Sequence, residues 1–203
     1  MKIKKQTLLL GLIGILIAII LVNQYMIFNT SSLLKNGVST TGITAKPLNQ
    51  EQNANLQAII NEIVPKGVPE YGGAASVSYD SVDKSLQTLV GYHTNIKLSG
   101  SDQQRYIKIG TTRETACEFC CGIGEAGFAD EKGNLQCECA HTLALSGLTK
   151  WLIKNTNYSD EQIVGAIKSW KGIFFPGPMV SKELNKRGIN PESAGLPSIQ
   201  GGC

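Results

Sequence analysis

The strongest hydrophobic pattern in the chain is an uninterrupted apolar run near its N-terminus, residues 7–22, and no charged residue occurs within residues 7–33. As a helix rising about 1.5 Å per residue, residues 7–28 would measure about 33 Å, which is enough to cross the hydrocarbon core of a bilayer. Tyr25 would then lie at the level of the headgroups, where aromatic side chains act as anchors. The pattern predicts a membrane anchor, residues 1–28, formed by a single N-terminal transmembrane helix.

A cleaved signal peptide is the alternative interpretation of the same run. Its basic start is present, but no small-x-small cleavage site follows in residues 23–28, so an uncleaved anchor is favoured. Lys2, Lys4 and Lys5 precede the run, and only Lys35 follows it closely. The positive-inside bias therefore predicts a single-pass protein of the cell membrane, with a cytoplasmic N-terminus and an extracytoplasmic C-terminal domain.

Beyond the anchor, composition separates a polar linker from a cysteine-rich domain. Residues 29–50 are rich in Ser, Thr, Asn and Gly, as is typical of a linker. Residues 51–178 contain no second linker and are interpreted as one exported domain. Pro176 and Pro178 are expected to prevent a helix, and residues 179–203 are predicted to be a tail because they hold few large apolar groups.

Within the domain, the clearest periodicity is helical. Leu56, Ile59, Ile60 and Ile63 recur at helical spacing before Pro65, and a short helix is predicted over residues 81–90. Residues 94–98 and 105–109 are interpreted as a small two-stranded element because the second of these segments alternates apolar and polar side chains. A helix through residues 101–109 is the alternative.

The last part of the domain predicts two further helices. The first starts near Ala140 and buries Leu145, Leu148 and Leu152. The second starts at Ser159, where Ser159 and Gln162 have the spacing of a capping box, and Gly172 is expected to end it. The predicted fold class is therefore α+β and mostly helical, with one transmembrane helix and one small exported domain.

The net charge of the chain beyond the anchor gives little information about its partners. The chain has 19 Lys and Arg against 16 Asp and Glu, and three of the lysines precede the apolar run, so the rest of the chain has no net charge. No basic stripe with interleaved aromatic residues occurs, and nucleic acid is not an expected partner. The expected partners are the membrane and an unidentified protein that exchanges metal or electrons.

Chemistry concentrates in a cysteine cluster. Five of the six cysteines lie within 23 residues, and a histidine follows two positions later; the sixth cysteine ends the chain. The glycine-rich segment between the two cysteine strings predicts a tight reversal that brings them together. The candidate metal ligands are Cys117, Cys120, Cys121, Cys137, Cys139 and His141.

The spacing leaves two geometries open around Cys137, Cys139 and His141. In an extended segment their side chains would point to the same side. If a helix begins at Cys139, the histidine turns away and Cys139 occupies a helix N-terminus, where a thiolate is stabilised.

Three functional hypotheses follow from the cluster. The leading one is a membrane-tethered metal-binding protein rather than an enzyme, because thiolates with one imidazole favour copper(I), with an iron–sulfur cluster or zinc as alternatives. The second is a thiol–disulfide oxidoreductase with Cys117 and Cys120 as the reactive pair and Cys121 or Cys139 resolving, although Glu118 and Phe119 bring no positive charge to that pair. The third is a structural surface protein held by disulfides, because exported thiols oxidise.

Other catalytic constellations are not indicated. His93 has no partner evident from the sequence and is interpreted as a surface or packing residue, so no Ser-His-Asp set is predicted. The glycines at positions 122, 124 and 127 match a dinucleotide fingerprint by letter, but they follow a cysteine turn and no βαβ pattern surrounds them.

Residues 64–178 carry a resemblance to exported proteins. The strings that carry it are Arg105-Tyr-Ile-Lys-Ile, Cys117-Glu-Phe-Cys-Cys-Gly, Cys137-x-Cys-Ala-His141, Gly147-Leu, Trp170-Lys and Phe174-Phe-Pro-Gly-Pro. The chain resembles an uncharacterised cysteine-rich exported family of archaea and small-genome bacteria, and is loosely similar to PCYCGC-motif proteins, although that string itself is absent. The resemblance implies an exported, cysteine-rich, metal-binding domain. A further similarity, to the membrane-anchored thiol reductant of cytochrome c maturation, rests on the C-x-x-C string and on Ser159-Asp-Glu-Gln-Ile163.

Overall fold

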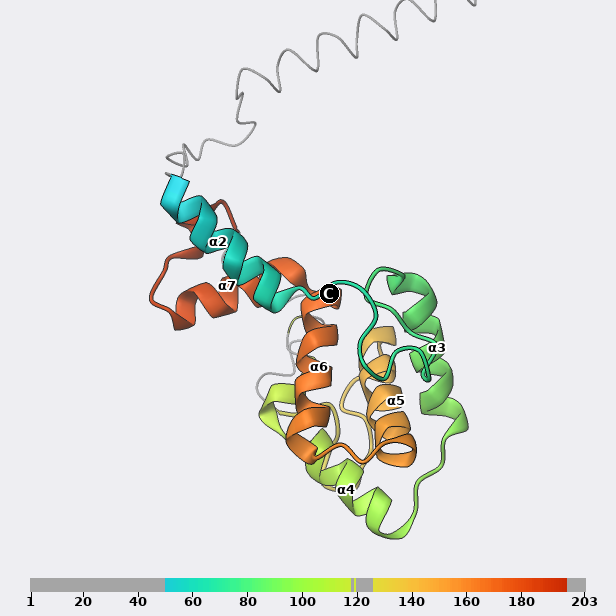
Figure 1. Ribbon diagram of the computed structural model, residues 1–203. Helices are drawn as coiled ribbons and strands as arrows, with labels where there is room; N and C mark the ends of the chain where they lie inside the picture. The colour runs from blue at the N-terminus through green and yellow to red at the C-terminus, as the bar shows by residue number, and fades with distance from the viewer. Residues whose placement is uncertain (1–49, 118, 120–125, 197–203) are drawn as a thin grey trace, which may run out of the picture. The chain divides into compact units, whose positions relative to one another are not determined.

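The computed structural model describes residues 50–117, 119 and 126–196. Figure 1 shows these residues as a set of α-helices joined by loops and short 3-10 turns. The elements are α2 (Gln50–Ile63), α3 (Val82–Asn95), α4 (Gly100–Gly110), η1 (Arg113–Thr115), α5 (Ala140–Asn155), α6 (Asp160–Phe174), α7 (Pro176–Lys186) and η2 (Pro191–Ala194).

The predicted α+β class is wrong for the described residues, which contain no strand and only one isolated bridge, between Ala129 and Leu135. The first predicted strand begins inside α3, and the second lies within α4. Tyr106 and Ile109 are three residues apart and are both buried, so the segment follows the helical period rather than the two-residue period. The alternative of a helix through residues 101–109 is confirmed.

The core is built around α5, which lies between its neighbours α3, α4 and α6 (Figure 1). Leu145, Leu148 and Leu152 are fully buried, as the sequence predicted. The capping box of α6 is also confirmed, because the Ser159 hydroxyl accepts from the Gln162 amide at 3.3 Å and the Gln162 side chain accepts from the Ser159 amide at 2.8 Å. Helix type and the buried faces were therefore predictable in this part of the chain.

A second, smaller apolar cluster joins α2 to α7, with Ile59, Val180 and Leu184 at its centre. The expectation that Pro176 and Pro178 prevent a helix is wrong. Both prolines lie in the first turn of α7, where backbone N–H groups have no intrahelical acceptor and the fixed φ of proline is already helical. The first part of the predicted tail is therefore a packed helix.

The transmembrane description is corrected for the described residues. None of their helices has both the length and the apolar character that crossing a bilayer requires. The apolar run of residues 7–28, on which the prediction of an anchor rests, lies outside them. The predicted extracytoplasmic location of the domain stays a prediction.

Candidate functional site

Two cysteines from different parts of the chain meet at the N-terminus of α5. The Cys117 Sγ atom lies 3.9 Å from the Cys139 Sγ atom, and neither residue is disulfide-bonded. A disulfide bond is about 2.05 Å long, so the sulfurs are in contact and not bonded. The prediction that the two cysteine strings converge beside this helix is confirmed for these two residues.

The two thiols differ in their access to solvent. Cys117 lies two residues after η1 and is only 5% exposed, whereas Cys139 is half-buried. An external reagent therefore reaches the sulfur of Cys139 more easily than that of Cys117.

Cys139 is the N-cap residue of α5. Its Sγ atom accepts from the Thr142 backbone N–H at 3.5 Å and lies 3.4 Å from the Thr142 hydroxyl. The unpaired N–H groups of a helix start and the helix dipole favour negative charge at this position. Of the two geometries that the sequence left open, the helix that begins beside Cys139 is the one observed.

The loop before α5 returns the chain to Cys117 through a tight turn. The Asp130 carboxylate accepts from the backbone N–H of Lys132 and from both the backbone N–H and the side-chain amide of Asn134, which lowers the pKa of Asp130. The isolated bridge between Ala129 and Leu135 closes the turn. The glycine-rich reversal predicted between the cysteine strings is thus confirmed for residues 126–136.

Burial dominates the electrostatics of Cys117. Together with the neighbouring Cys139, it raises the pKa of the thiol from 9.0 to about 11. A hydrogen bond from Thr142 and the positive charge of Lys171 act in the opposite direction. Cys117 is therefore a protonated thiol at neutral pH.

Lys171 of α6 is the residue at this site that sequence reasoning missed. Its side chain is buried, with 2% exposed, and its Nζ atom donates to the Glu114 carbonyl oxygen at 3.0 Å. The same atom lies 6.0 Å from the ring centroid of Phe119. One signal was available, because Lys171 follows Ile167 by four residues and so falls on the buried face of its helix.

The predicted metal site is not assembled in the part of the chain that the structure describes. Cys137 is disulfide-bonded, and its partner is neither Cys117 nor Cys139, because neither of those is in a disulfide. The His141 ring packs against Phe174 and Phe175, with centroid distances of 4.9 and 4.8 Å.

No group of three or more Cys, His, Asp or Glu side chains among the described residues is arranged to hold a metal ion. The description of the chain as a metal-binding protein is therefore wrong within these residues, since a disulfide removes one predicted thiolate and aromatic packing holds the imidazole. Cys120 and Cys121 lie outside the described residues, and a ligand role for them stays a prediction.

A buried hydrogen-bond chain gives His93 a partner that the sequence did not reveal. The Ser146 hydroxyl lies 2.8 Å from His93 Nδ1 and 2.7 Å from the Tyr106 hydroxyl. Ser146 is fully buried, so the chain links α3, α4 and α5 and does not expose a nucleophile. This hydrogen-bond chain is therefore expected to affect the stability of the fold and not to take part in catalysis.

Stability is expected to fall as the pH drops below neutral. Burial, Lys150 and Lys97 lower the pKa of His93 from 6.5 against an opposing effect of Glu138, and burial lowers the pKa of His141. Below about pH 6.5 the unfolded chain therefore binds more protons than the folded one. The contribution of these histidines to the free energy of unfolding is complete above this pH, and it is lost as the pH falls from there toward their lowered pKa values in the folded state.

Urea unfolding at about pH 7 and about pH 5.5 measures this effect. We expect a lower midpoint at the lower pH, and a smaller difference in a His93→Asn variant, whose amide can still bond the Ser146 hydroxyl. Equal midpoints for the wild-type protein at the two pH values would contradict the prediction.

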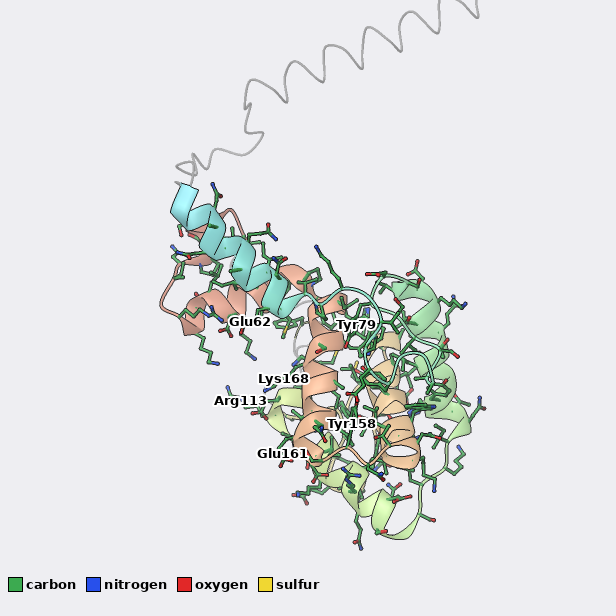
Figure 2. The ribbon with its side chains drawn as sticks, in the orientation of Figure 1. Glu62, Tyr79, Arg113, Tyr158, Glu161 and Lys168 are labelled. Atoms are coloured by element: carbon green, nitrogen blue, oxygen red, sulfur yellow. The ribbon has the colours of Figure 1, made fainter. Side chains whose placement is uncertain are left out.

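A cavity of about 350 Å³ lies against α6, near α2 and α7 (Figure 2 labels Glu62 and Lys168 on its wall). Its lining carries charges of both signs. Two of its carboxylates, Glu62 and Glu183, pair with Arg187 at 2.7 Å each. Glu114 and Lys171 also line it, so one wall of the cavity adjoins the segment that leads to Cys117.

Comparisons of the chain with protein-family models, with curated proteins and with solved structures found no match.

Proposed function

We propose that the chain is a thiol–disulfide exchange protein in which Cys117 and Cys139 form the reactive pair. The observation that carries the proposal is the 3.9 Å separation of two sulfurs that are not disulfide-bonded and are 22 residues apart in sequence. A small movement closes this gap to a disulfide bond. Thiols held together in this way exchange two electrons with a substrate disulfide.

The difference in exposure assigns the two roles. The Cys139 thiolate, stabilised at the start of α5, attacks a substrate disulfide; a bond forms between Cys139 and one substrate sulfur, and the other substrate sulfur leaves as a thiolate. Cys117 then attacks the Cys139 sulfur, giving the Cys117–Cys139 disulfide and releasing the second substrate thiolate. The two protons of the cysteine thiols end on the substrate thiols.

The substrate is therefore reduced by two electrons and the cysteine pair is oxidised by two. A dithiol reductant returns the pair to its starting state by the reverse sequence. Which direction predominates depends on the reduction potential of the pair relative to its surroundings.

The presence of both disulfide-bonded cysteines and reduced thiols favours this proposal over a purely structural disulfide framework. Cys137 is disulfide-bonded, while Cys139, two residues later, lies beside Cys117 without a disulfide. In a framework that serves only to staple the fold, adjacent thiols at this distance would be expected to be bonded.

A redox titration tests the proposal. The full-length protein is equilibrated in mixtures of reduced and oxidised glutathione and alkylated, and the linked peptide that contains Cys117 and Cys139 is quantified by mass spectrometry. We expect a reversible transition at a potential above about −300 mV, outside the range typical of structural disulfides. A Cys139→Ser variant is the control, because it removes the linked peptide.

The contradicting result is a wild-type protein in which the two cysteines never become linked, even in the most oxidising mixture. A Cys117–Cys139 bond that no glutathione mixture reduces would also reject exchange, in favour of a structural role.

A further inference from the structure

This inference rests on the proposed exchange and concerns how the oxidised pair is reopened. An incoming thiolate attacks the half-buried sulfur of Cys139, a new S–S bond forms there, and the Cys117–Cys139 bond breaks with both of its electrons going to Cys117. The negative charge of the leaving group therefore appears at a site that is 5% exposed. Burial raises the pKa of Cys117, which makes this thiol a poor leaving group, and the positive charge of Lys171 acts in the opposite direction.

Lys171 is held at this position by residues on both sides of Cys117. Its Nζ atom donates to the carbonyl oxygen of Glu114, three residues before Cys117, at 3.0 Å. The same atom lies 6.0 Å from the ring of Phe119, two residues after Cys117. The ammonium group is buried with the thiol, and at low local dielectric its charge acts strongly over short distances.

We propose that Lys171 stabilises the Cys117 thiolate as it leaves and so sets the rate at which the disulfide opens. The other groups that act on Cys117 do not replace it. The Thr142 hydroxyl is neutral, and a thiolate on Cys139 would repel the leaving charge. Lys171 is the positively charged residue that acts on Cys117 among the described residues.

Lys171 is expected to change the rate at which the Cys117–Cys139 disulfide is reduced, but not its equilibrium with glutathione. At neutral pH the fully reduced Cys117 is a neutral thiol, so its thiolate exists only in passing while the bond breaks. Loss of the ammonium group should therefore slow reduction of the disulfide by about tenfold and leave the equilibrium with glutathione at neutral pH unchanged. A purely structural role would loosen the site and change the equilibrium as well.

The experiment uses the oxidised full-length protein. The Cys117–Cys139 bond is reduced with dithiothreitol, the reaction is stopped by alkylation at set times, and the linked peptide is followed by mass spectrometry. Lys171→Met should react about tenfold more slowly than wild type, and Lys171→Arg, which keeps the charge, should stay within about twofold. Lys171→Gln takes the place of the methionine variant if circular dichroism shows that the latter does not fold.

Lys168→Met is the matched control, because Lys168 lies one turn earlier on α6 and is exposed (Figure 2). It should open at the wild-type rate. Equal rates for wild type and Lys171→Met, or an arginine variant as slow as the methionine variant, would overturn the role of Lys171. A wild-type protein that forms no Cys117–Cys139 disulfide would instead reject the exchange function itself.

Discussion

Replacing Gly147 by alanine is expected to lower the free energy of unfolding by about 3 kcal/mol, at the upper end of the cost of overpacking a core. Gly147 lies at a close approach between α5 and α3. A Cβ atom at this position would lie 1.9 Å from the Leu89 carbonyl oxygen and 2.7 Å from the His93 backbone nitrogen. Both are backbone atoms, so the clash is relieved only if the two helices separate.

Gly91→Ala is the matched control on the facing helix. Gly91 lies inside α3, and a Cβ atom there meets no heavy atom within 4 Å. Alanine is favoured over glycine in a helix interior by about 1 kcal/mol, so this variant should be slightly more stable than wild type. Urea unfolding of the three proteins measures the difference, and equal midpoints for the two variants would show that the close approach of α3 and α5 is not needed.

Local signals were sufficient to predict several helices of this chain. The helix that begins at Ser159 was predictable because a capping box and an apolar face lie next to each other in sequence. The burial of Leu145, Leu148 and Leu152 in α5 was predictable from spacing alone. In each case the information lies within one or two helical turns.

The predictions were wrong where the same residues fitted two different structural patterns. Residues 105–109 alternate as a strand would, yet Tyr106 and Ile109 are buried at helical spacing in α4. Gly172 was expected to end α6, which continues to Phe174. A Cβ atom at Gly172 would lie 1.9 Å from the Ile63 carbonyl oxygen, so packing against the end of α2, rather than helix capping, accounts for the glycine.

At the candidate site, the sequence located the thiols but not their surroundings. The glycine-rich reversal indicated that Cys117 and Cys139 would meet. The weakness of the redox hypothesis was the absence of a positive charge near Cys117, and Lys171 supplies that charge from a helix 54 residues later in the chain. The bond between His93 and Ser146 is equally distant in sequence. Contacts of this range depend on how the helices pack, which composition and spacing do not encode.

The second large effect is expected from the two single-cysteine variants. Without Cys117, a mixed disulfide between Cys139 and glutathione has no second thiol to resolve it, so a Cys117→Ser variant exposed to oxidised glutathione should accumulate the adduct at Cys139 on nearly every chain. Without Cys139, the thiol that remains is 5% exposed, and burial raises its pKa. A Cys139→Ser variant should therefore form the adduct at Cys117 at least about 100-fold more slowly, because this thiol is shielded from the reagent and is rarely ionised at pH 7.

Peptide mass spectrometry of these two variants after exposure to oxidised glutathione is the most direct test of the proposed exchange. Wild type should pass through the adduct at Cys139 and end as the Cys117–Cys139 disulfide, and Cys117→Ser should stop at the adduct. Equal and slow adduct formation at both cysteines, with no Cys117–Cys139 disulfide in wild type, would contradict the account and leave the pair as two unreactive thiols.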